Sequence, residues 1–293
     1  MAVPPHHIVT EPPPFDQPPY PADIFAGQTV LVSGGGSGMG LAMAKAFAQG
    51  GAKVAVMGRS LERAEAGAAE IATLGATVHA LSADVRDPAA IAAAFDESEQ
   101  VLGPVTLLAN NAGANFPVLS ENISANAWNA VTRIAIDGTF LCSSEMVRRC
   151  IARGDSGAIV NNSAQYIWTG FPGDAHSAAA KTAQATMTKA MAREWKAFGI
   201  RVNAVAAGFF PHASTSNGDA ADAIAPLQNM IPAGRTGRIR EFGWLSAMTC
   251  TPLFGTMTGQ VIVQDGAESL RRSLMMPDFV PPRERVNGPW GWQ

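Results

Sequence analysis

A glycine-rich segment between an apolar run and an Ala-rich segment constrains this chain most strongly. Glycines let the backbone turn sharply, and they let a pyrophosphate approach the free N–H groups and positive dipole end of a following helix. The apolar run Thr29–Val32 and the Ala-rich segment Gly38–Gln49 flank the glycines, so strand, turn and helix follow in order. This order predicts a dinucleotide-binding turn, with a flexible Gly-rich loop as the alternative. The candidate phosphate contacts are Ser33, Gly34, Gly36, Ser37, Gly38, Met39 and Gly40.

The rest of the chain continues the same alternation of short Val/Ile/Leu runs and longer Ala-rich segments. Strands that helices cover on both faces read this way, and strands alternating with helices become parallel. We therefore expect an α/β fold: a single-domain, doubly wound (Rossmann) parallel seven-stranded sheet with helices on both faces. The expected strands are Thr29–Val32, Lys53–Met57, Thr77–Ala80, Val105–Leu108, Ala158–Val160, Arg201–Val205 and Gln260–Val263. The expected helices include Gly38–Gln49, Leu61–Leu74, Pro88–Leu102, Ala125–Ala152 and Ala175–Ala197.

The two ends of the chain differ from its middle. Eight of the 20 prolines lie between Pro4 and Pro21, so residues 1–26 are expected to form a proline-rich arm that is extended or disordered. Residues 273–293 form a tail with two tryptophans, and we expect this tail to dock because apolar rings gain from burial. Residues 27–272 then form the one folded domain.

Composition excludes several classes of function. Basic and acidic side chains number 21 and 24, without a dense Lys/Arg cluster, which argues against a nucleic-acid partner. No apolar run approaches the roughly 18 residues that span a bilayer. The leader does not read as a signal peptide, and the three cysteines form no metal-ligand pattern. We expect a cytoplasmic protein with no membrane partner and no metal site.

The residues after the second and third strands bear on the choice of dinucleotide. A carboxylate at the end of the second strand binds the ribose hydroxyls of NAD and repels a 2′-phosphate. Gly58 and Arg59 stand there instead, so Arg59 favours NADP(H), with a solvated surface arginine as the alternative. Asp84 and Val85 follow the third strand and are candidates for the adenine site, although Asp84 could simply cap a helix or pair with Arg86.

Three motifs follow one another along the chain: Gly34/Gly38/Gly40, Asn110-Asn111-Ala112-Gly113, and Thr258-Gly259-Gln260 leading to Asp265-Gly266. In this order they resemble the short-chain dehydrogenase/reductase family, and the resemblance covers nearly all of the chain between the two tails. It implies that Asn110 stabilises the sheet beside a nicotinamide cofactor, and it implies a homotetramer built through Ala125–Ala152 and Ala175–Ala197. It also places the cofactor's nicotinamide end at Asn111, Ala112, Gly113 and Gly208.

The usual catalytic pattern of that family is incomplete here. The pattern pairs a Tyr with a Lys four residues later, and adds a Ser and an Asn. Lys181 is present, but Ser177 stands at the Tyr position, Ala164 at the Ser position and Ala135 at the Asn position. We therefore do not expect an ordinary alcohol dehydrogenase.

Four other side chains are similar to the 2,4-dienoyl-CoA reductase branch of the family: Asn115, Tyr166, Ser177 and Lys181. This likeness implies that Asn115 and Tyr166 hold the thioester oxygen, while Ser177 and Lys181 hold and order the nicotinamide ribose. A buried Lys181 ammonium needs partners, and we expect Ser177 and the ribose hydroxyls to supply them. Reduction of a conjugated double bond pushes charge onto that oxygen, and two fixed neutral donors would stabilise the enolate. The expected activity is NADP-dependent reduction of an enoyl or dienoyl thioester.

Each of these assignments has a structural alternative. Tyr166 could be a core tyrosine, Asn115 a turn-forming residue, and Lys181 a surface lysine. His176 could pass a proton, because its pKa lies near neutrality, although a histidine at a helix start is more often structural. His212 could line the acyl pocket or simply decorate a loop.

Other readings of the whole chain stay open. One is a carbonyl reductase in which Tyr166, taken as the only phenol of the folded region, donates the proton. Another is a non-catalytic dinucleotide-binding protein. Gly208–Ile231 is the expected substrate lid. Arg235, Arg238 and Arg240 could serve coenzyme A phosphates, with a solvated helix start as the alternative.

Overall fold

The computed structural model describes residues 11–212 and 231–270, which form one sheet of seven parallel strands. The strand order is β3-β2-β1-β4-β5-β6-β7. This doubly wound order confirms the Rossmann fold expected from the alternating sequence. The strands are β1 (Thr29–Ser33), β2 (Lys53–Gly58), β3 (Val78–Ser82), β4 (Val105–Asn110), β5 (Gly157–Ala164), β6 (Ile200–Ala207) and β7 (Val261–Gln264).

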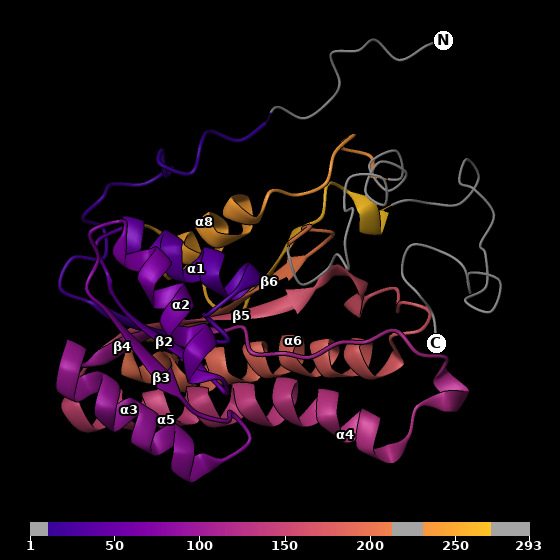
Figure 1. Cartoon of the computed structure of the whole chain (residues 1–293), viewed down its shortest axis with the longest axis horizontal. Coiled ribbons are helices and arrows are strands. Elements are labelled where there is room, and N and C mark those ends of the chain that lie inside the picture. The colour runs from indigo at the N-terminus through magenta and orange to yellow at the C-terminus, as the bar shows by residue number, and fades with distance from the viewer. Residues whose placement is uncertain (1–10, 213–230, 271–293) are drawn as a thin grey trace.

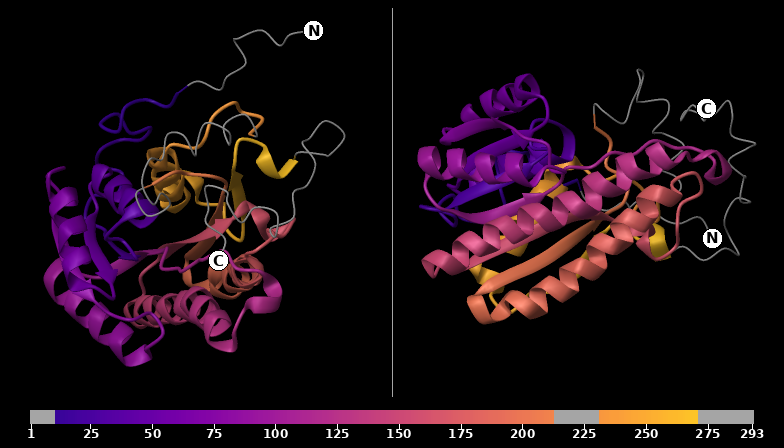
Figure 2. Two further views of the ribbon diagram at one scale, coloured as in Figure 1. Left: turned by 45° about the vertical axis from the view of Figure 1, so that its right-hand side comes forward. Right: turned by 90° about the horizontal axis from the view of Figure 1, so that it is seen from below.

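Helices cover both faces of the sheet, as Figures 1 and 2 show. Helices α1, α2 and α8 pack on one face over one apolar cluster, and α3, α5 and α6 pack on the other over a second cluster. This double coverage explains why most strands are apolar throughout. The helices are α1 (Gly38–Gln49), α2 (Leu61–Ala72), α3 (Pro88–Leu102), α4 (Ala125–Thr132), α5 (Gly138–Arg153), α6 (Ala175–Trp195) and α8 (Ile239–Cys250).

The chain reverses its direction of winding between β1 and β4. The two strands are neighbours, and Ser33 at the end of β1 pairs in register with Asn110 at the end of β4. The segments that follow these strands therefore lie side by side at the carboxyl edge of the sheet. Ligands of open α/β sheets bind in the crevice at this switch point.

Most strands extend further than their apolar runs. β5 runs to Ala164, beyond the expected Ala158–Val160, because its polar continuation is buried and hydrogen-bonded. The Asn161 amide, for example, donates to the Thr188 hydroxyl at 2.9 Å. The expected helix Ala125–Ala152 is present, but a π-helical turn, Arg133–Asp137, separates α4 from α5.

Helix α8 is not among the helices expected from the sequence. A glycine, Gly243, interrupts its apolar pattern and lowers its helix propensity. The structure shows why glycine stands there: a methyl group on Gly243 would lie 2.4 Å from the Ala42 carbonyl oxygen of α1. The close packing of α8 on α1 thus depends on a residue that weakens the helix signal.

The expectation of an extended or disordered leader is wrong for its described part. Tyr20 is buried, and its hydroxyl donates to the Ala46 carbonyl of α1 at 2.7 Å. Phe25 is fully buried with its ring 5.1 Å from that of Phe47, while Phe15 stacks on Trp244 of α8 at 6.3 Å. Aromatic side chains between the prolines supply the apolar surface that attaches the leader. Tyr166 is therefore not the only phenol within the folded part.

Two expectations fall on residues that the structure does not describe. The docked tail, residues 273–293, lies outside the described residues, and so does most of the expected lid, residues 213–230. None of the described helices is both long enough and apolar enough to cross a bilayer.

Candidate active site

The glycine turn between β1 and α1 has the shape that a close ligand approach requires. Gly34 and Gly38 have φ angles of +66° and +54°, which side chains disfavour. A methyl group on Gly40 would lie 2.1 Å from the Gly34 carbonyl oxygen. Ser37, the N-cap of α1, makes no side-chain capping hydrogen bond, so its hydroxyl does not cover the first N–H groups of the helix. This cradle fits a dinucleotide pyrophosphate.

Two other residues expected to contact the phosphates shape the turn itself. A methyl group on Gly36 would lie 2.5 Å from the Arg63 carbonyl oxygen, so Gly36 lets α2 approach the turn. The Ser33 hydroxyl accepts from the N–H groups of Asn111 and Ala112, both at 3.1 Å. Ser33 thus ties the end of β1 to the segment after β4.

The asparagines at the end of β4 hold the crevice together. The Asn110 amide donates to the Ser143 hydroxyl and to the Asn161 side-chain oxygen, both at 2.9 Å, which links β4 to α5 and β5. The Asn111 amide donates to the Gly34 carbonyl at 3.1 Å, and its oxygen accepts from Asn162 at 2.8 Å. The residues that follow, Ala112 and Gly113, therefore start from a fixed position at the mouth of the crevice.

The region expected to hold adenine, after β2 and β3, carries the exposed cation Arg59 and a paired carboxylate, Asp84. Arg59 is exposed at the end of β2. Asp84 accepts from Arg86 through both oxygens, with Nε 2.9 Å from Oδ1, and this hydrogen bond lowers the pKa of Asp84 to about 2. The Asp84 carboxylate is thus held by Arg86, which was the structural alternative, while buried Val85 packs against Gly138.

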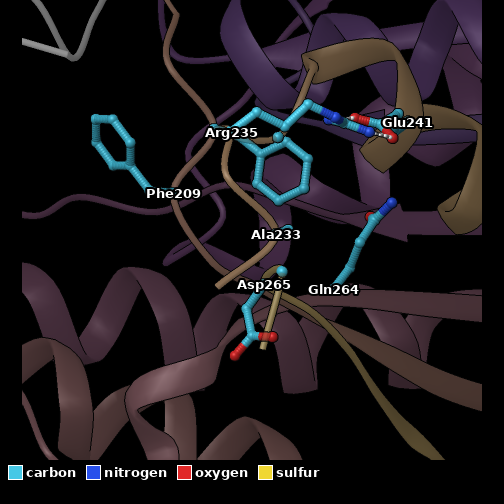
Figure 3. A pocket seen from close by; sticks show the side chains of 9 residues that line it. Phe209, Ala233, Arg235, Glu241, Gln264 and Asp265 are labelled. Carbon is cyan, nitrogen blue, oxygen red and sulfur yellow. Dashed lines mark hydrogen bonds and ion pairs between the residues drawn. The ribbon is translucent and has the colours of Figure 1, made fainter. Parts of the chain in front are cut away.

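A cavity of about 170 Å³ lies beyond the ends of β6 and β7 (Figure 3). Gly208 directly precedes the lining residues Phe209 and Phe210: its N–H donates to the Gln264 carbonyl at 2.9 Å, and a methyl group there would lie 2.6 Å from Asp265 Cα. Figure 3 shows Arg235 turned toward Glu241, with which it forms an ion pair at 2.8 Å. The charge of Arg235 in the cavity wall is therefore neutralised by Glu241.

The other two arginines suggested for coenzyme A phosphates hold the leader. Arg238 forms an ion pair with Glu11, in which its Nε lies 2.9 Å from the carboxylate. Arg240 donates to the carbonyls of Pro13 and Pro12, at 2.8 and 3.1 Å. All three arginines thus have protein partners, and the structure favours a packing role for them.

The residues expected to hold the nicotinamide ribose lie on α6, with a different pairing from the one expected. The Lys181 ammonium donates to the Asn162 carbonyl, and burial lowers the pKa of Lys181 to about 8. The expectation that Ser177 partners this ammonium is wrong for this structure. The Ser177 hydroxyl instead forms a hydrogen bond of 2.8 Å with the Tyr166 hydroxyl.

Tyr166 and Asn115 share an electrostatic neighbour, the acidic side chain of Asp174. Burial raises the pKa of the Tyr166 phenol, the Ser177 hydrogen bond lowers it, and the charge of Asp174 raises it further. Asn115 is exposed, and it lowers the pKa of the buried Asp174 carboxyl, which burial raises. The phenol is therefore held in its neutral, proton-donating form, and both Tyr166 and Asn115 interact electrostatically with Asp174.

Two of the positions that lack the usual catalytic groups lie at the end of β5 and in the π-helical turn. Ala164 is buried at the end of β5. Ala135 lies in the π-helical turn, where its carbonyl accepts from the Gln184 amide of α6 at 3.0 Å. π-Helical turns are frequent at functional sites, and this one faces the helix that carries Lys181.

The two histidines lie in different places. His176 is fully buried on α6, and its Nδ1 accepts from the Ser177 N–H at 2.8 Å. His212 lies over the phosphate turn, because a methyl group on Gly38 would be 3.3 Å from its ring. His212 therefore lies beside the glycine turn, and its suggested role in an acyl pocket stays a prediction.

The sequence reasoning missed two residues of this site, Asp174 and Asn162. Asp174 stands immediately before α6, where an acidic residue reads as an ordinary helix cap. The Asn162 contacts arise from its carbonyl and amide at the end of β5, and no local pattern reports such long-range pairing. The only sequence sign of this long-range pairing is that polar residues directly follow the apolar part of a strand.

The chain is similar to known proteins over most of its length. The family profile described as enoyl-(acyl carrier protein) reductase matches residues 34–267. A probable 2,4-dienoyl-CoA reductase of Bacillus subtilis is 36% identical, over 83% of this chain and 97% of that protein. The peroxisomal 2,4-dienoyl-CoA reductase of Danio rerio is 32% identical, over 84% of this chain and 83% of that protein.

Solved structures show the same fold. The crystal structure of a short chain dehydrogenase from Bacillus anthracis superposes with a TM-score of 0.77 at 34% identity. The match covers 84% of this chain and 98% of that one. Both the sheet and its flanking helices thus have a close counterpart among experimentally determined dehydrogenases.

Proposed function

Because the chain belongs to the short-chain dehydrogenase/reductase family, we propose that it reduces the conjugated double bond of an enoyl or dienoyl thioester with NADPH. The observation that carries this proposal is the site around Tyr166. Its phenol bonds to Ser177 at 2.8 Å and shares the neighbour Asp174 with Asn115. The names of the relatives from Bacillus subtilis and Danio rerio support the same activity.

The described residues suit NADP(H). The glycine turn would hold the pyrophosphate, Asn111, Ala112 and Gly113 would border the nicotinamide ribose, and Lys181 would bind the ribose hydroxyls. Arg59 would bind the 2′-phosphate, because no carboxylate stands at the end of β2 to repel it. When bound, NADPH would supply the hydride.

Asn115 and Tyr166 would then stabilise the charge that develops on the substrate. Reduction of the conjugated bond moves negative charge onto the thioester oxygen, and donors fixed in place bind such a charge best. The raised pKa of Tyr166 keeps the phenol protonated, so it donates throughout the reaction. The Ser177 hydroxyl can in turn donate to the phenol oxygen and orient it.

Exposed aromatic side chains beside the site suit an apolar acyl chain. Phe116, Trp168 and Phe171 are 37%, 56% and 40% exposed. The Phe116 ring contacts that of His176 at 4.8 Å, and the Phe171 ring lies 5.9 Å from that of Tyr166. Contiguous exposed apolar surface commonly marks a binding site. These rings would cover the carbon chain of the thioester.

A homotetramer is part of the proposal. Trp128, Phe140 and Ile151 on the segment from α4 to α5 are 41%, 48% and 43% exposed. Large apolar side chains on one exposed helical segment are suited to burial between subunits. Sedimentation of the wild type and of a variant with Phe140→Glu would test this: the wild type should sediment as a tetramer and the variant as a smaller species.

The test of the activity is NADPH oxidation with a 2,4-dienoyl-CoA and, separately, with simple ketones. Turnover of the dienoyl thioester is expected, and Tyr166→Phe should lower kcat roughly 10²- to 10³-fold, the usual effect of removing one oxyanion donor. NADPH affinity should stay unchanged in this variant. Turnover of ketones alone would reject the proposal in favour of a carbonyl reductase, and tight NADPH binding without any turnover would favour a non-catalytic protein.

A further inference from the structure

Asp84 places a carboxylate close to the residue expected to bind the 2′-phosphate of the cofactor. Arg59 directly follows β2, and Asp84 stands shortly after β3. The two strands are paired in register, with Gly58 opposite Ser82. Beyond this pair the Ala83 N–H donates to the Gly58 carbonyl at 3.0 Å, and the Ser82 hydroxyl donates to the Arg59 carbonyl at 3.2 Å. The two segments therefore leave the sheet side by side, and a phosphate held by Arg59 would lie near the Asp84 carboxylate.

Arg86 occupies both oxygens of that carboxylate. Its Nε lies 2.9 Å from Oδ1 and 3.1 Å from Oδ2 of Asp84, and its Nη2 lies 2.5 Å from Oδ2. The backbone N–H of Arg86 also donates to Oδ1, at 2.9 Å. A guanidinium holds a carboxylate in this bidentate way with a fixed geometry. The side chains of Asp84 and Arg86 are 30% and 32% exposed, so the ion pair lies where a ligand can meet it.

Protonation does not remove the charge of Asp84. The hydrogen bond from Arg86 and, less strongly, the charges of Arg86 and Arg59 lower the pKa of Asp84 to about 2, although burial raises it. The carboxylate is therefore ionised at neutral pH, and a cation has to balance it. The other carboxylate of this segment, Asp87, caps α3 and accepts from the Ala89 N–H at 2.9 Å. The ion pair with Arg86 is thus what neutralises the charge nearest to Arg59.

The charge of this carboxylate matters for one cofactor and not for the other. The 2′-phosphate of NADPH carries about two negative charges, and an unpaired carboxylate beside it would repel it. NADH has no such phosphate, so the same carboxylate would leave its binding unaffected. We propose that Arg86 is a specificity-determining residue, which neutralises the Asp84 carboxylate and thereby lets the phosphate of NADPH bind at Arg59. This inference rests on the proposed function, in particular on its choice of NADPH.

Titrations of the full chain with NADPH and with NADH, followed by nicotinamide fluorescence, test this role. Arg86→Ala should weaken NADPH binding roughly 10-fold through an uncompensated like charge, and it should leave NADH binding unchanged. Adding Asp84→Asn to this variant should restore NADPH binding, because the carboxylate that repels the phosphate is then gone. Arg86→Lys keeps the positive charge and should bind NADPH nearly as the wild type does. Arg148→Ala is the matched control: it removes the cation that pairs with Glu145 on α5, and both affinities should stay unchanged.

The other outcomes of these titrations would overturn the inference. Unchanged NADPH affinity in Arg86→Ala, or equal losses for NADPH and NADH, would leave Arg86 with a structural role only. Failure of Asp84→Asn to restore NADPH binding would mean that Arg86 binds the phosphate itself. A wild type that binds NADPH no more tightly than NADH would contradict both this role and the choice of NADPH. Turnover is not part of the test, so a wild type that binds NADPH as described but reduces no dienoyl thioester would reject the proposed activity and leave the role of Arg86 standing.

Discussion

Replacing Gly40 by alanine tests the phosphate turn most severely. The new methyl group would lie 2.1 Å from the Gly34 carbonyl oxygen and 2.4 Å from the Asn111 amide nitrogen. Ordinary contacts of carbon are about 3.5 Å or longer, so more than 1 Å must open between two segments. These segments are themselves joined, because Asn111 donates to the Gly34 carbonyl at 3.1 Å. Overpacking of this kind costs about 1–3 kcal/mol, and we expect a loss of about 3 kcal/mol of unfolding free energy.

Thermal unfolding with and without NADPH measures this effect. At roughly 2–4 °C per kcal/mol for a chain of this size, the melting temperature of Gly40→Ala should fall by about 6–12 °C. The stabilisation by NADPH should also disappear, because the turn that would hold the pyrophosphate is displaced. Gly255→Ala is the matched control: its methyl group would meet the Pro252 carbonyl at an ordinary 3.5 Å. If Gly40→Ala melts like the control and NADPH stabilises it equally, the reasoning about the turn is wrong.

The remaining predictions concern the cofactor and the leader. Arg59→Ala should weaken NADPH binding roughly 10- to 100-fold, the worth of a charge-assisted hydrogen bond, and leave NADH binding unchanged; equal losses for both would contradict a phosphate contact. Burial lowers the pKa of Lys181 to about 8, so NADPH affinity in titrations should decrease as pH rises above 8 and the ammonium loses its charge. Lys181→Arg, which stays charged, should not show this decrease. Phe25→Ala should cost about 3–5 kcal/mol in denaturant unfolding, whereas Phe198→Ala, at a side chain 48% exposed, should cost less than about 1 kcal/mol.

The parallel, doubly wound sheet followed from patterns that are local in the sequence. Apolar strands between Ala-rich helices require burial on both faces, and this requirement alone leads to the parallel, doubly wound architecture. Features that depend on distant neighbours were not predicted. The glycine at position 243 hides α8 in the sequence, and the reason for it is the close approach of α8 to α1. The burial of Tyr20 likewise depends on a distant partner, because its hydroxyl donates to a carbonyl of α1.

The candidate site was predictable to the extent that it repeats a family pattern. The separation of Tyr166 from Lys181 indicated a reductase branch, and the structure places Tyr166 beside Ser177. Spacing could not reveal that Ser177 bonds to the phenol rather than to the ammonium, because both are within reach of one helix face. Nor could it reveal the state of Asp174, which looks like an ordinary helix cap in the sequence but is buried and makes no capping hydrogen bond in the structure.

The most direct test of the central claim follows the transferred hydrogen. NADPH deuterated at the transferable position of nicotinamide C4 is incubated with the protein and a 2,4-dienoyl-CoA, and the product is analysed by mass spectrometry and NMR. One deuterium should appear on a carbon of the former diene, with the thioester carbonyl intact. Deuterium on a carbinol carbon, with the carbonyl reduced, would contradict an amide and a phenol that stabilise an enolate.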